Sequence, residues 1–338
     1  MYLRSCKSSV MIIVKRRRIF FLLLVIIVFI VVIFEWHSDQ SSVRTFPTKF
    51  SERDYVSFPV FQENTINHIT RIWKPTKSRA RVFDMVEDQL VKSECVLLDT
   101  PNGTTPICIY DPSNDRMISS YVKDYGTWEH DLLNATGSVF LRYPELSFFD
   151  LGCNIGVYTL YVAKLGGHVV AVDAVWTSLS LLHTSVKLGH FQKRVTIIWN
   201  AVSDVYENVT VEIPPSNVGG AHLVSKKSTD SSDFTNLVET VTLNDFIEFF
   251  KSKKVFMKMD IEGYELRALR GGQDFFESVD VRYILMEWVH HRYNDNGNKI
   301  IHILLPYGFL PYTNINQHIM LNIDRSNTWP ENVFWIKR

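Results

Sequence analysis

The sequence lacks an excess of charge of either sign, has few cysteines and contains no sustained repeat. Its 338 residues include 36 basic and 36 acidic side chains, so the formal net charge is zero. A general nucleic-acid-binding protein usually has a basic excess, and no nucleic-acid partner is therefore expected. The cysteines Cys6, Cys95, Cys108 and Cys153 form no C-x-x-C pair and are too scattered for a zinc cluster. One large domain with additional segments is the natural interpretation.

One long apolar run stands near the N-terminus. Residues 19–34 are apolar without interruption, a basic run (15–18) precedes them and Trp36 follows them. A membrane-spanning helix needs about 20 residues, or about 17 at the short end, and the positive-inside rule places the basic run in the cytosol. The sequence therefore predicts a cytosolic tail (1–18) and a transmembrane signal anchor (19–36). A cleaved signal peptide is the alternative, but residues 35–37 offer no small-residue cleavage site.

This arrangement is that of a single-pass type II membrane protein of the Golgi or endoplasmic reticulum, with the rest of the chain luminal. Asn102, Asn134 and Asn208 each begin an N-x-T glycosylation sequon, which agrees with a luminal position. Cys95 and Cys108 flank a Pro-Asn-Gly turn between two apolar runs, which predicts a hairpin closed by a disulfide in an oxidising compartment. Two buried free thiols are the alternative.

Two segments follow the predicted anchor. Residues 37–78 are polar with few periodic apolar positions, and we interpret them as a stem. Residues 79–144 are interpreted as an N-terminal cap region, in which residues 79–94 are expected to form one amphipathic helix. The cluster of residues 125–130 is either a lid over a site or ordinary packing of Tyr125 and Trp128 against the core.

From residue 145 onward, strand-like and helix-like patterns alternate, which is typical of an α/β fold with a mostly parallel sheet and helices on both faces. The expected strands are residues 146–151, 169–172, 195–199, 255–259, 281–286 and 333–336, and the expected helices are residues 155–165, 177–188 and 264–276. An insertion is expected at residues 204–239.

Polar residues end the predicted parallel strands. They are Asp150, Asp173, Asn200, Asp260 and Glu287. Ligands of such sheets bind outside the carboxyl ends of the strands, so these residues are expected to converge on one crevice. Asp173 ends the second strand, where an acidic residue binds ribose hydroxyls in nucleotide-binding folds.

The turn after the first strand indicates which nucleotide cofactor the crevice holds. A dinucleotide site has the pattern G-x-G-x-x-G, whereas this chain has Asp150-x-Gly152-x-Asn154-x-Gly156 and no third glycine. The two glycines let a ligand lie against the main chain, and the following helix directs its N-terminal amides at that ligand. A leading acid suits the cationic amino and sulfonium groups of S-adenosylmethionine, which we therefore favour over nicotinamide or flavin cofactors.

A second cluster of ionisable residues lies at the end of the fourth strand. Lys258, Asp260, Glu262 and Glu265 stand within eight positions. Lys258 and Asp260 point the same way on a strand and would share one desolvated site. Such charges are costly unless they are paired or functional. A capping acid with a surface ion pair is the alternative interpretation.

These stretches give the chain a resemblance to the FkbM-type methyltransferases, a branch of the class I S-adenosylmethionine-dependent methyltransferases with a Rossmann-like fold. The resemblance covers about residues 108–336, and the stretches that carry it are 149–159, 200–204, 242–245 and 258–265. Asp173-Ala174 departs from the family, which more often has Glu-Pro there. The resemblance implies a methyltransferase catalytic domain over residues 145–338 that acts as an O-methyltransferase, and the luminal position then implies a glycan acceptor.

For this reaction we assign roles to the clustered residues as a hypothesis. Asp260 is the base that takes the proton of the acceptor hydroxyl, Glu262 orients it and Lys258 tunes the pair, with Glu287 as the rival base. The residues expected to hold the amino-acid and ribose parts of the cofactor are Asp150, Gly152, Asn154, Gly156 and Asp173, and Asn200 and Ala201 are expected to edge the adenine.

No metal is assigned, although two alternatives are open. His290 and His291 follow the fifth strand, and as adjacent strand residues they would face opposite sides, so a surface or acceptor-binding role is favoured over metal binding. Asp260, Glu262 and Glu287 could instead hold a divalent cation. Trp288, Tyr293 and Tyr312 either stack on a sugar or belong to an aromatic core.

Two other functions compete with glycan methylation. The acceptor could be a lipid or a small metabolite, because the glycan rests on topology and family analogy. The chain could also be a non-catalytic, membrane-tethered binding protein that keeps the fold, although the intact Asp150 turn and the Lys258–Glu262 cluster argue against decay. A luminal enzyme would need its cofactor imported from the cytosol.

Overall fold

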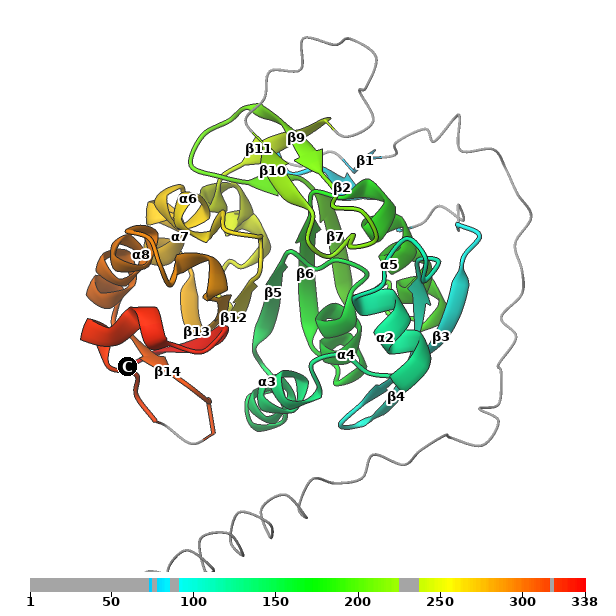
Figure 1. The fold of residues 1–338 in the computed structure, drawn as a ribbon, viewed down its shortest axis with the longest axis horizontal. Helices are drawn as coiled ribbons and strands as arrows, with labels where there is room; N and C mark the ends of the chain where they lie inside the picture. The colour runs from blue at the N-terminus through cyan, green and yellow to red at the C-terminus, as the bar shows by residue number, and fades with distance from the viewer. Residues whose placement is uncertain (1–72, 75–77, 86–90, 225–236, 317–318) are drawn as a thin grey trace, which may run out of the picture. The chain divides into compact units, whose positions relative to one another are not determined.

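The computed structural model describes residues 73–74, 78–85, 91–224, 237–316 and 319–338 (Figure 1). The chain divides into two units, residues 1–55 and 56–338, and every described residue lies in the second. The predicted cytosolic tail and transmembrane anchor, and nearly all of the predicted stem, therefore lie outside the described residues. Within the described ranges, no helix has the length and apolar character needed to cross a bilayer.

A nine-stranded sheet forms the centre of the second unit. Its five middle strands, from β7 to β13, are parallel, and the strands added at both edges are antiparallel to their neighbours. In sheet order the strands are β1 (Trp73–Lys74), β2 (Val82–Phe83), β7 (Val195–Trp199), β6 (His168–Asp173), β5 (Ser147–Leu151), β12 (Lys254–Met259), β13 (Asp280–Glu287), β15 (Asn332–Lys337) and β14 (Phe309–Tyr312).

Helices cover both faces of this sheet (Figure 1). One face packs against α2 (Ile118–Tyr125), α3 (His130–Arg142), α4 (Val157–Lys164) and α5 (Trp176–Leu188). The other packs against η3 (Leu243–Phe249), α6 (Glu265–Arg270), α7 (Gln273–Ser278) and α8 (Asn296–Leu304). Three short 3-10 helices complete the C-terminal part: η4 (Val289–His291), η5 (Leu305–Tyr307) and η6 (Ile323–Thr328).

The two hydrophobic layers begin at the central strand β5. All five of its residues are buried. Phe148 belongs to the layer under α3 and α4, and its ring centroid lies 5.7 Å from that of Phe256. Phe149 points to the opposite layer, 4.8 Å from Phe250. Because successive strand residues face opposite sides, one apolar strand anchors both layers, and each phenylalanine contributes about 1.5–3 kcal/mol through burial.

The predicted Rossmann-like α/β fold is confirmed, with a mostly parallel sheet and helices on both faces. The strand predicted at residues 195–199 is β7 itself, and each of the others differs from the observed strand by one residue at one end or at both ends. The single helix predicted at residues 264–276 is wrong, because the chain forms α6 and α7 with Gly271 and Gly272 between them. A Cβ atom at Gly271 would meet the Ser203 backbone oxygen at 2.4 Å, so this corner requires glycine.

The helix predicted at residues 79–94 is also wrong. Val82 and Phe83 form β2, which pairs with β7 at Ile198. Val82 packs in one hydrophobic layer and Phe83 in the other, as the two faces of a strand require. The edge of a large sheet thus determines the conformation of a segment whose local pattern resembles a helix, and β2 makes part of the predicted cap region a component of the central sheet.

The hairpin predicted around the cysteine pair is confirmed. β3 (Glu94–Thr100) and β4 (Gly103–Ile109) are antiparallel, and Cys95 stands opposite Cys108 in their register. A disulfide joins the two cysteines, and Cys153 is a buried free thiol.

The insertion forms most of a second, four-stranded sheet. Its order is β10 (His222–Val224), β9 (Asn208–Glu212), β11 (Leu237–Val241) and β8 (Ala201–Val202). Arg267 of α6 binds this insertion, because its guanidinium donates to Asp204 at 2.8 Å and to Glu207 at 2.9 Å. The insertion is thereby fixed beside the carboxyl ends of the central strands, and its residues Val218 and Leu223 line the pocket described below.

The disulfide yields a prediction about stability. It closes a loop with a sequence separation of 13, and such a loop restricts the unfolded chain by an amount worth about 3 kcal/mol. We expect the double variant Cys95→Ser, Cys108→Ser to lose about that much free energy of unfolding in urea titrations. Wild-type protein in reductant should match the variant. A loss below about 0.5 kcal/mol, the usual effect of a surface substitution, would contradict the assignment.

Candidate active site

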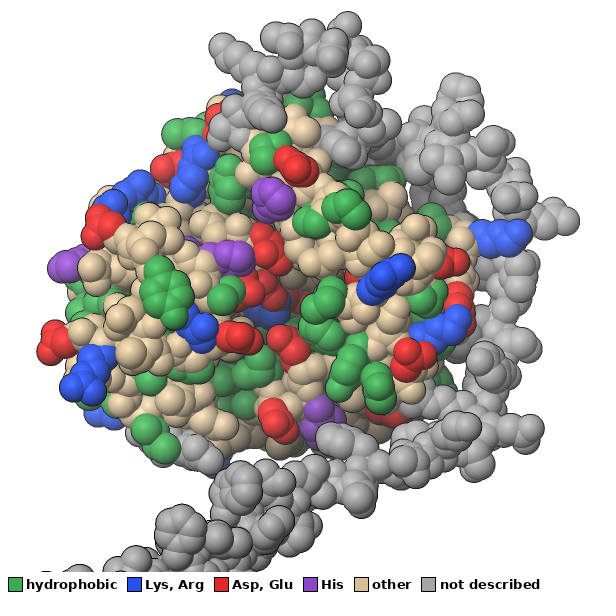
Figure 2. Space-filling view, in the orientation of Figure 1, with side chains coloured by type: hydrophobic (Ala, Val, Ile, Leu, Met, Phe, Trp, Pro, Cys, Tyr) green, Lys and Arg blue, Asp and Glu red, His purple; other side chains and the backbone are tan. Residues whose placement is uncertain are grey.

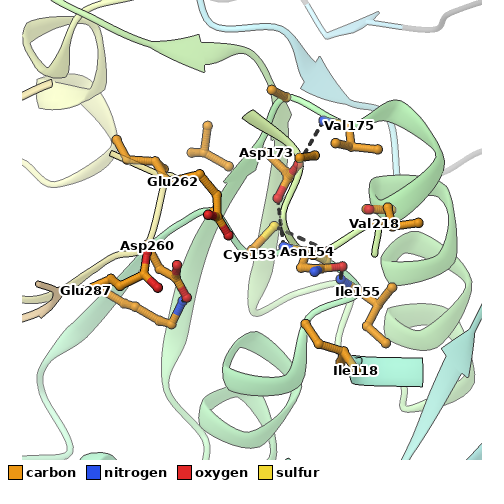
Figure 3. A pocket seen from close by; sticks show the side chains of 18 of the residues that line it. Ile118, Cys153, Asn154, Ile155, Asp173, Val175, Val218, Asp260, Glu262 and Glu287 are labelled. Carbon is orange, nitrogen blue, oxygen red and sulfur yellow. Dashed lines mark hydrogen bonds and ion pairs between the residues drawn. The ribbon is translucent and has the colours of Figure 1, made fainter. Parts of the chain in front are cut away.

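The principal pocket lies at the carboxyl ends of the parallel strands and has a volume of about 260 Å³ (Figure 3). Nine of the eleven residues predicted for the site line it: Gly152, Asn154, Asp173, Asn200, Ala201, Lys258, Asp260, Glu262 and Glu287. Asp150 and Gly156 do not. The expected convergence of strand ends is therefore observed for four of the five polar residues, and their individual roles in binding and catalysis stay predictions.

Asp150 lies beneath the turn, where it is almost completely buried. Its Oδ2 accepts a hydrogen bond from the Thr159 hydroxyl at 2.6 Å. The aspartate thus holds the first turn of α4 against the end of β5. Burial raises the pKa of this carboxyl, although Lys258 and the Thr159 hydroxyl oppose the shift. Asp150 shapes the cofactor turn from below, which differs from the direct ligand contact that its position in the motif suggests.

Asp173 connects the first and second strand ends. Its Oδ2 accepts from the Asn154 backbone N–H and its Oδ1 from the Val175 backbone N–H, both at 2.8 Å (Figure 3). Burial raises the pKa of Asp173 to about 6, against the opposing effect of these two backbone hydrogen bonds. Each carboxylate oxygen keeps a further lone pair that can accept from a hydroxyl. The predicted contact with ribose is compatible with this geometry.

The glycines of the turn are required by packing within the protein. Gly152 has φ +76°, and a Cβ atom there would lie 1.7 Å from the Asp260 backbone oxygen. A Cβ atom at Gly156, with φ +93°, would lie 2.3 Å from Leu182 Cδ1. Gly152 therefore brings the turn after β5 against the end of β12, and Gly156 brings α4 against α5. Only Gly152 also lines the pocket.

Asn200 joins three segments at the far side of the pocket. Its Oδ1 accepts from the Arg81 backbone N–H at 2.8 Å, and its Nδ2 donates to the Glu239 backbone oxygen at 3.1 Å. Asn200 and Ala201 both line the pocket, where we predicted the edge of the adenine.

A buried lysine lies at the floor of the pocket. The Lys258 side chain is 7% exposed, and its Nζ donates to Asp260 Oδ2 at 2.8 Å. The Tyr158 ring lies 5.0 Å from the same Nζ. Burial lowers the pKa of Lys258, but the carboxylates of Asp260, Asp150 and Glu129 outweigh this effect and raise the pKa overall. Lys258 therefore carries a positive charge that several carboxylates share.

Glu129 and Tyr158 were missed by the sequence predictions. Glu129 precedes α3 with a left-handed backbone (φ 46°), lines the pocket, and accepts from the Tyr158 hydroxyl at 2.7 Å. Burial raises the pKa of Glu129, and Lys258 opposes the shift. Sequence offered a weak signal for Glu129, because it stands inside the 125–130 cluster.

A second group of carboxylates forms the wall opposite the cofactor turn. His290 Nε2 lies 3.1 Å from Glu262 Oε2 and 3.4 Å from Glu287 Oε2. Burial, followed by repulsion from Asp260, Glu262 and Glu265, raises the pKa of Glu287 from 4.5 to about 9. Glu287 is thus protonated at neutral pH, which disfavours it as the rival base. Among the described residues, Glu262, Glu287 and His290 are close enough to share a metal ion, a different trio from the one considered in the sequence.

The expectation for the histidine pair is wrong in its premise. His290 and His291 lie in the 3-10 helix η4, so they do not alternate as strand residues do. His291 is buried, with Nε2 2.8 Å from Glu265 Oε2, and a surface or acceptor-binding role is excluded for it. Trp288 and Tyr312 are core residues with 0% and 1% exposure, whereas Tyr293 is 86% exposed.

The fold and this site define the class of protein. A Rossmann-like sheet with a glycine turn after its first strand, an acid at the end of its second and an acidic wall at the fourth and fifth is the arrangement of a class I S-adenosylmethionine-dependent methyltransferase. Residues 150–316 match the family model described as "Methyltransferase FkbM domain". The chain therefore carries an FkbM-type methyltransferase domain, and its cofactor is S-adenosylmethionine.

Other comparisons give distant similarities. No curated protein matches the chain. Similar solved structures include a precorrin-6y C5,15-methyltransferase from Geobacter metallireducens (11% identity, TM-score 0.32, 62% of this chain and 88% of that chain). They also include a SAM-dependent methyltransferase from Agrobacterium tumefaciens (9%, 0.38, 73% and 71%) and a SAM-dependent O-methyltransferase from Thermotoga maritima (11%, 0.33, 72% and 77%).

The clash at Gly152 predicts the effect of one added methyl group. In Gly152→Ala the new Cβ atom must displace the end of β12, so we expect a loss of at least about 3 kcal/mol of unfolding free energy and loss of S-adenosylmethionine binding by calorimetry. Gly166→Ala is the matched control, because φ is +96° there and the nearest atom is 3.8 Å away. It should lose only about 1 kcal/mol and still bind. Equal losses in the two variants would show that the positive φ of the backbone accounts for the loss and that the contact with Asp260 does not.

The protonated state of Glu287 predicts a pH dependence of stability. Its native pKa lies above its unfolded value, so its contribution is fully present below pH 4.5 and is lost as pH rises toward 9. Glu287→Gln keeps the hydrogen-bonding shape and cannot ionise. We expect the variant to match the wild type in unfolding free energy at pH 5 and to exceed it by several kcal/mol, about 4, at pH 8.5, because each pKa unit of the shift corresponds to about 1.4 kcal/mol. A variant less stable than the wild type at pH 8.5 would refute the assignment.

Proposed function

We propose that the protein is a membrane-anchored O-methyltransferase that methylates a hydroxyl of a glycan in the lumen of the secretory pathway. The observation that carries the O-methyl assignment is the Asp260 carboxylate on the pocket wall, ion-paired with Lys258 at 2.8 Å. A hydroxyl is a weak nucleophile, and a carboxylate that takes its proton as the C–O bond forms accelerates the transfer.

The residues around Asp260 have different roles in the proposed reaction. S-adenosylmethionine, when bound, supplies an electrophilic methyl group. Gly152, Asn154 and Asp173 would hold it along the turn after β5. Asp260 receives the proton of the acceptor hydroxyl, and the ion pair with Lys258 at 2.8 Å holds this side chain in place. Glu129, Trp128 and α2 cover the other side of the pocket, which helps to exclude water and align the hydroxyl.

The compartment is inferred from three features. The basic run and apolar segment at residues 15–34 indicate an N-terminal anchor. The disulfide between Cys95 and Cys108 favours an oxidising compartment. The sequon residues Asn102, Asn134 and Asn208 are all exposed, so each is accessible to glycosylation. A hydroxyl-rich acceptor of that compartment is a glycan.

The test asks whether methylation of a cellular glycan depends on catalysis by this protein. In cells that lack the protein, mass spectrometry should show glycans that have lost one methyl group, and wild-type protein should restore the methyl group. Asp260→Asn should not restore it, because kcat falls by at least about 100-fold while S-adenosylmethionine binding persists.

Asp295→Asn provides a matched control. It also removes a carboxylate from a close ion pair, with Lys299 at 2.7 Å, but it lies on the surface outside the pocket lining. This variant should restore methylation. Normal turnover by Asp260→Asn would refute the assignment of Asp260 as the base. An unchanged glycan profile in the deficient cells would indicate that the acceptor is a lipid or a small metabolite instead of a glycan.

A further inference from the structure

An exposed aromatic surface extends from the mouth of the pocket across α2. We define the α2 platform as Met117, Tyr121, Tyr125 and Trp128. Met117 and Trp128 line the pocket. The Tyr121 ring lies 5.5 Å from Trp128, edge to face, and 4.5 Å from Tyr125. Met117, Tyr121 and Tyr125 are 51%, 42% and 59% exposed, so the rings form a continuous surface that leads out of the pocket.

This surface is distinct from the aromatic core. Large side chains of the sheet layers, such as Phe148 and Trp288, are completely buried. Figure 2 instead shows hydrophobic side chains exposed over α2, at the rim of the central hollow. It also lies before residue 150, outside the part of the chain that matches the family model. The family match therefore gives no account of these four residues.

The charge of the pocket restricts what can lie on the platform. Among the described residues that line the pocket, five are acidic, Glu129, Asp173, Asp260, Glu262 and Glu287, and only Lys258 is basic. Acidic side chains gather around the hollow in Figure 2. Asp260 already binds the Lys258 ammonium at 2.8 Å, so the one cation is committed within the site. Glu287 is protonated at neutral pH, but the other four acids still outnumber Lys258, so an acceptor with a phosphate, sulfate or carboxylate would be repelled by this wall.

The chemistry that fits both observations is a neutral sugar ring. The ring face of a pyranose is made of C–H groups, which pack on aromatic rings, and its edge carries hydroxyls, which suit carboxylates and tyrosine hydroxyl groups. We propose that the α2 platform is the acceptor subsite and that it binds an uncharged pyranose whose hydroxyl reaches Asp260. This inference rests on the proposed glycan methylation. It adds which residues of the protein bind the acceptor and that the acceptor is uncharged.

The experiment measures methyl transfer by the full chain to a panel of methyl glycosides. The panel contains neutral hexosides and 6-deoxyhexosides together with sulfated, phosphorylated and uronic acid counterparts. We expect turnover with at least one neutral glycoside and a kcat/KM at least about tenfold lower for its charged counterparts. Tyr121→Ala and Tyr125→Ala should each raise KM for the neutral glycoside about fivefold, with little change in kcat.

Two control measurements separate recognition from folding. S-adenosylmethionine affinity and the thermal unfolding midpoint should be unchanged in both tyrosine variants, because the two rings are exposed. Tyr206→Ala removes another half-exposed tyrosine, whose ring lies 4.4 Å from the Arg79 guanidinium and outside the pocket lining, and should leave KM unchanged.

The outcomes distinguish the inference from the proposed function. Turnover of a neutral glycoside with unchanged KM in Tyr121→Ala and Tyr125→Ala would overturn the platform and leave glycan methylation standing. A raised KM in Tyr293→Ala instead would overturn it in the same way. Preference for charged glycosides would overturn the charge class. Turnover of a lipid or metabolite and of no glycoside would overturn both the inference and the proposed function.

Discussion

The buried ammonium of Lys258 is the interaction on which the site depends. Three acids surround it and would repel one another without a cation: Asp150 from β5, Asp260 just beyond β12 and Glu129 before α3. A buried ion pair is not in itself a large source of stability, because desolvation offsets much of the attraction. Here the pair instead allows several carboxylates to occupy one sheet edge. Removing Lys258 would leave buried charges that nothing else among the described residues at the pocket floor compensates.

This arrangement gives similar side chains different chemical states. Asp260 contacts Lys258 directly, in an ion pair of 2.8 Å. Glu287, farther along the same wall, has a pKa of about 9 because burial and its acidic neighbours act together. Glu287 therefore retains its proton at neutral pH, whereas Asp260 is the acid in direct contact with the cation. Asp150 and Asp173 serve the shape of the site, since they fix α4 and the second loop through backbone and hydroxyl donors.

The fold was largely predictable because its signals are local and repeated. Apolar strands ending in polar residues, and glycines at Gly152 and Gly166, identify the parallel core. The site was predicted where strand topology alone brings residues together, as with Asp173 and Asp260. Glu129 was missed because its approach to Lys258 depends on how α3 packs, which no local pattern records. The helix predicted at residues 79–94 failed for a similar reason, since pairing with β7 decides the conformation of Val82. The glycines were recognised, but their close packing against Asp260 and Leu182 was visible only in three dimensions.

The most direct test of this account is the pH dependence of unfolding for Lys258→Met beside the wild type. Loss of the ammonium should destabilise the protein by about 3–5 kcal/mol at pH 7.5, because the three acids around it, Asp150, Asp260 and Glu129, then lie together without a cation. The deficit should narrow at pH 5, because burial raises the pKa of Asp150 and of Glu129, and these two carboxyls can take up protons once the cation is absent. The folded wild type keeps Lys258 charged across this whole range, since the pKa of Lys258 is raised. A variant as stable as the wild type at pH 7.5, or a deficit that grows toward pH 5, would contradict the central role of Lys258.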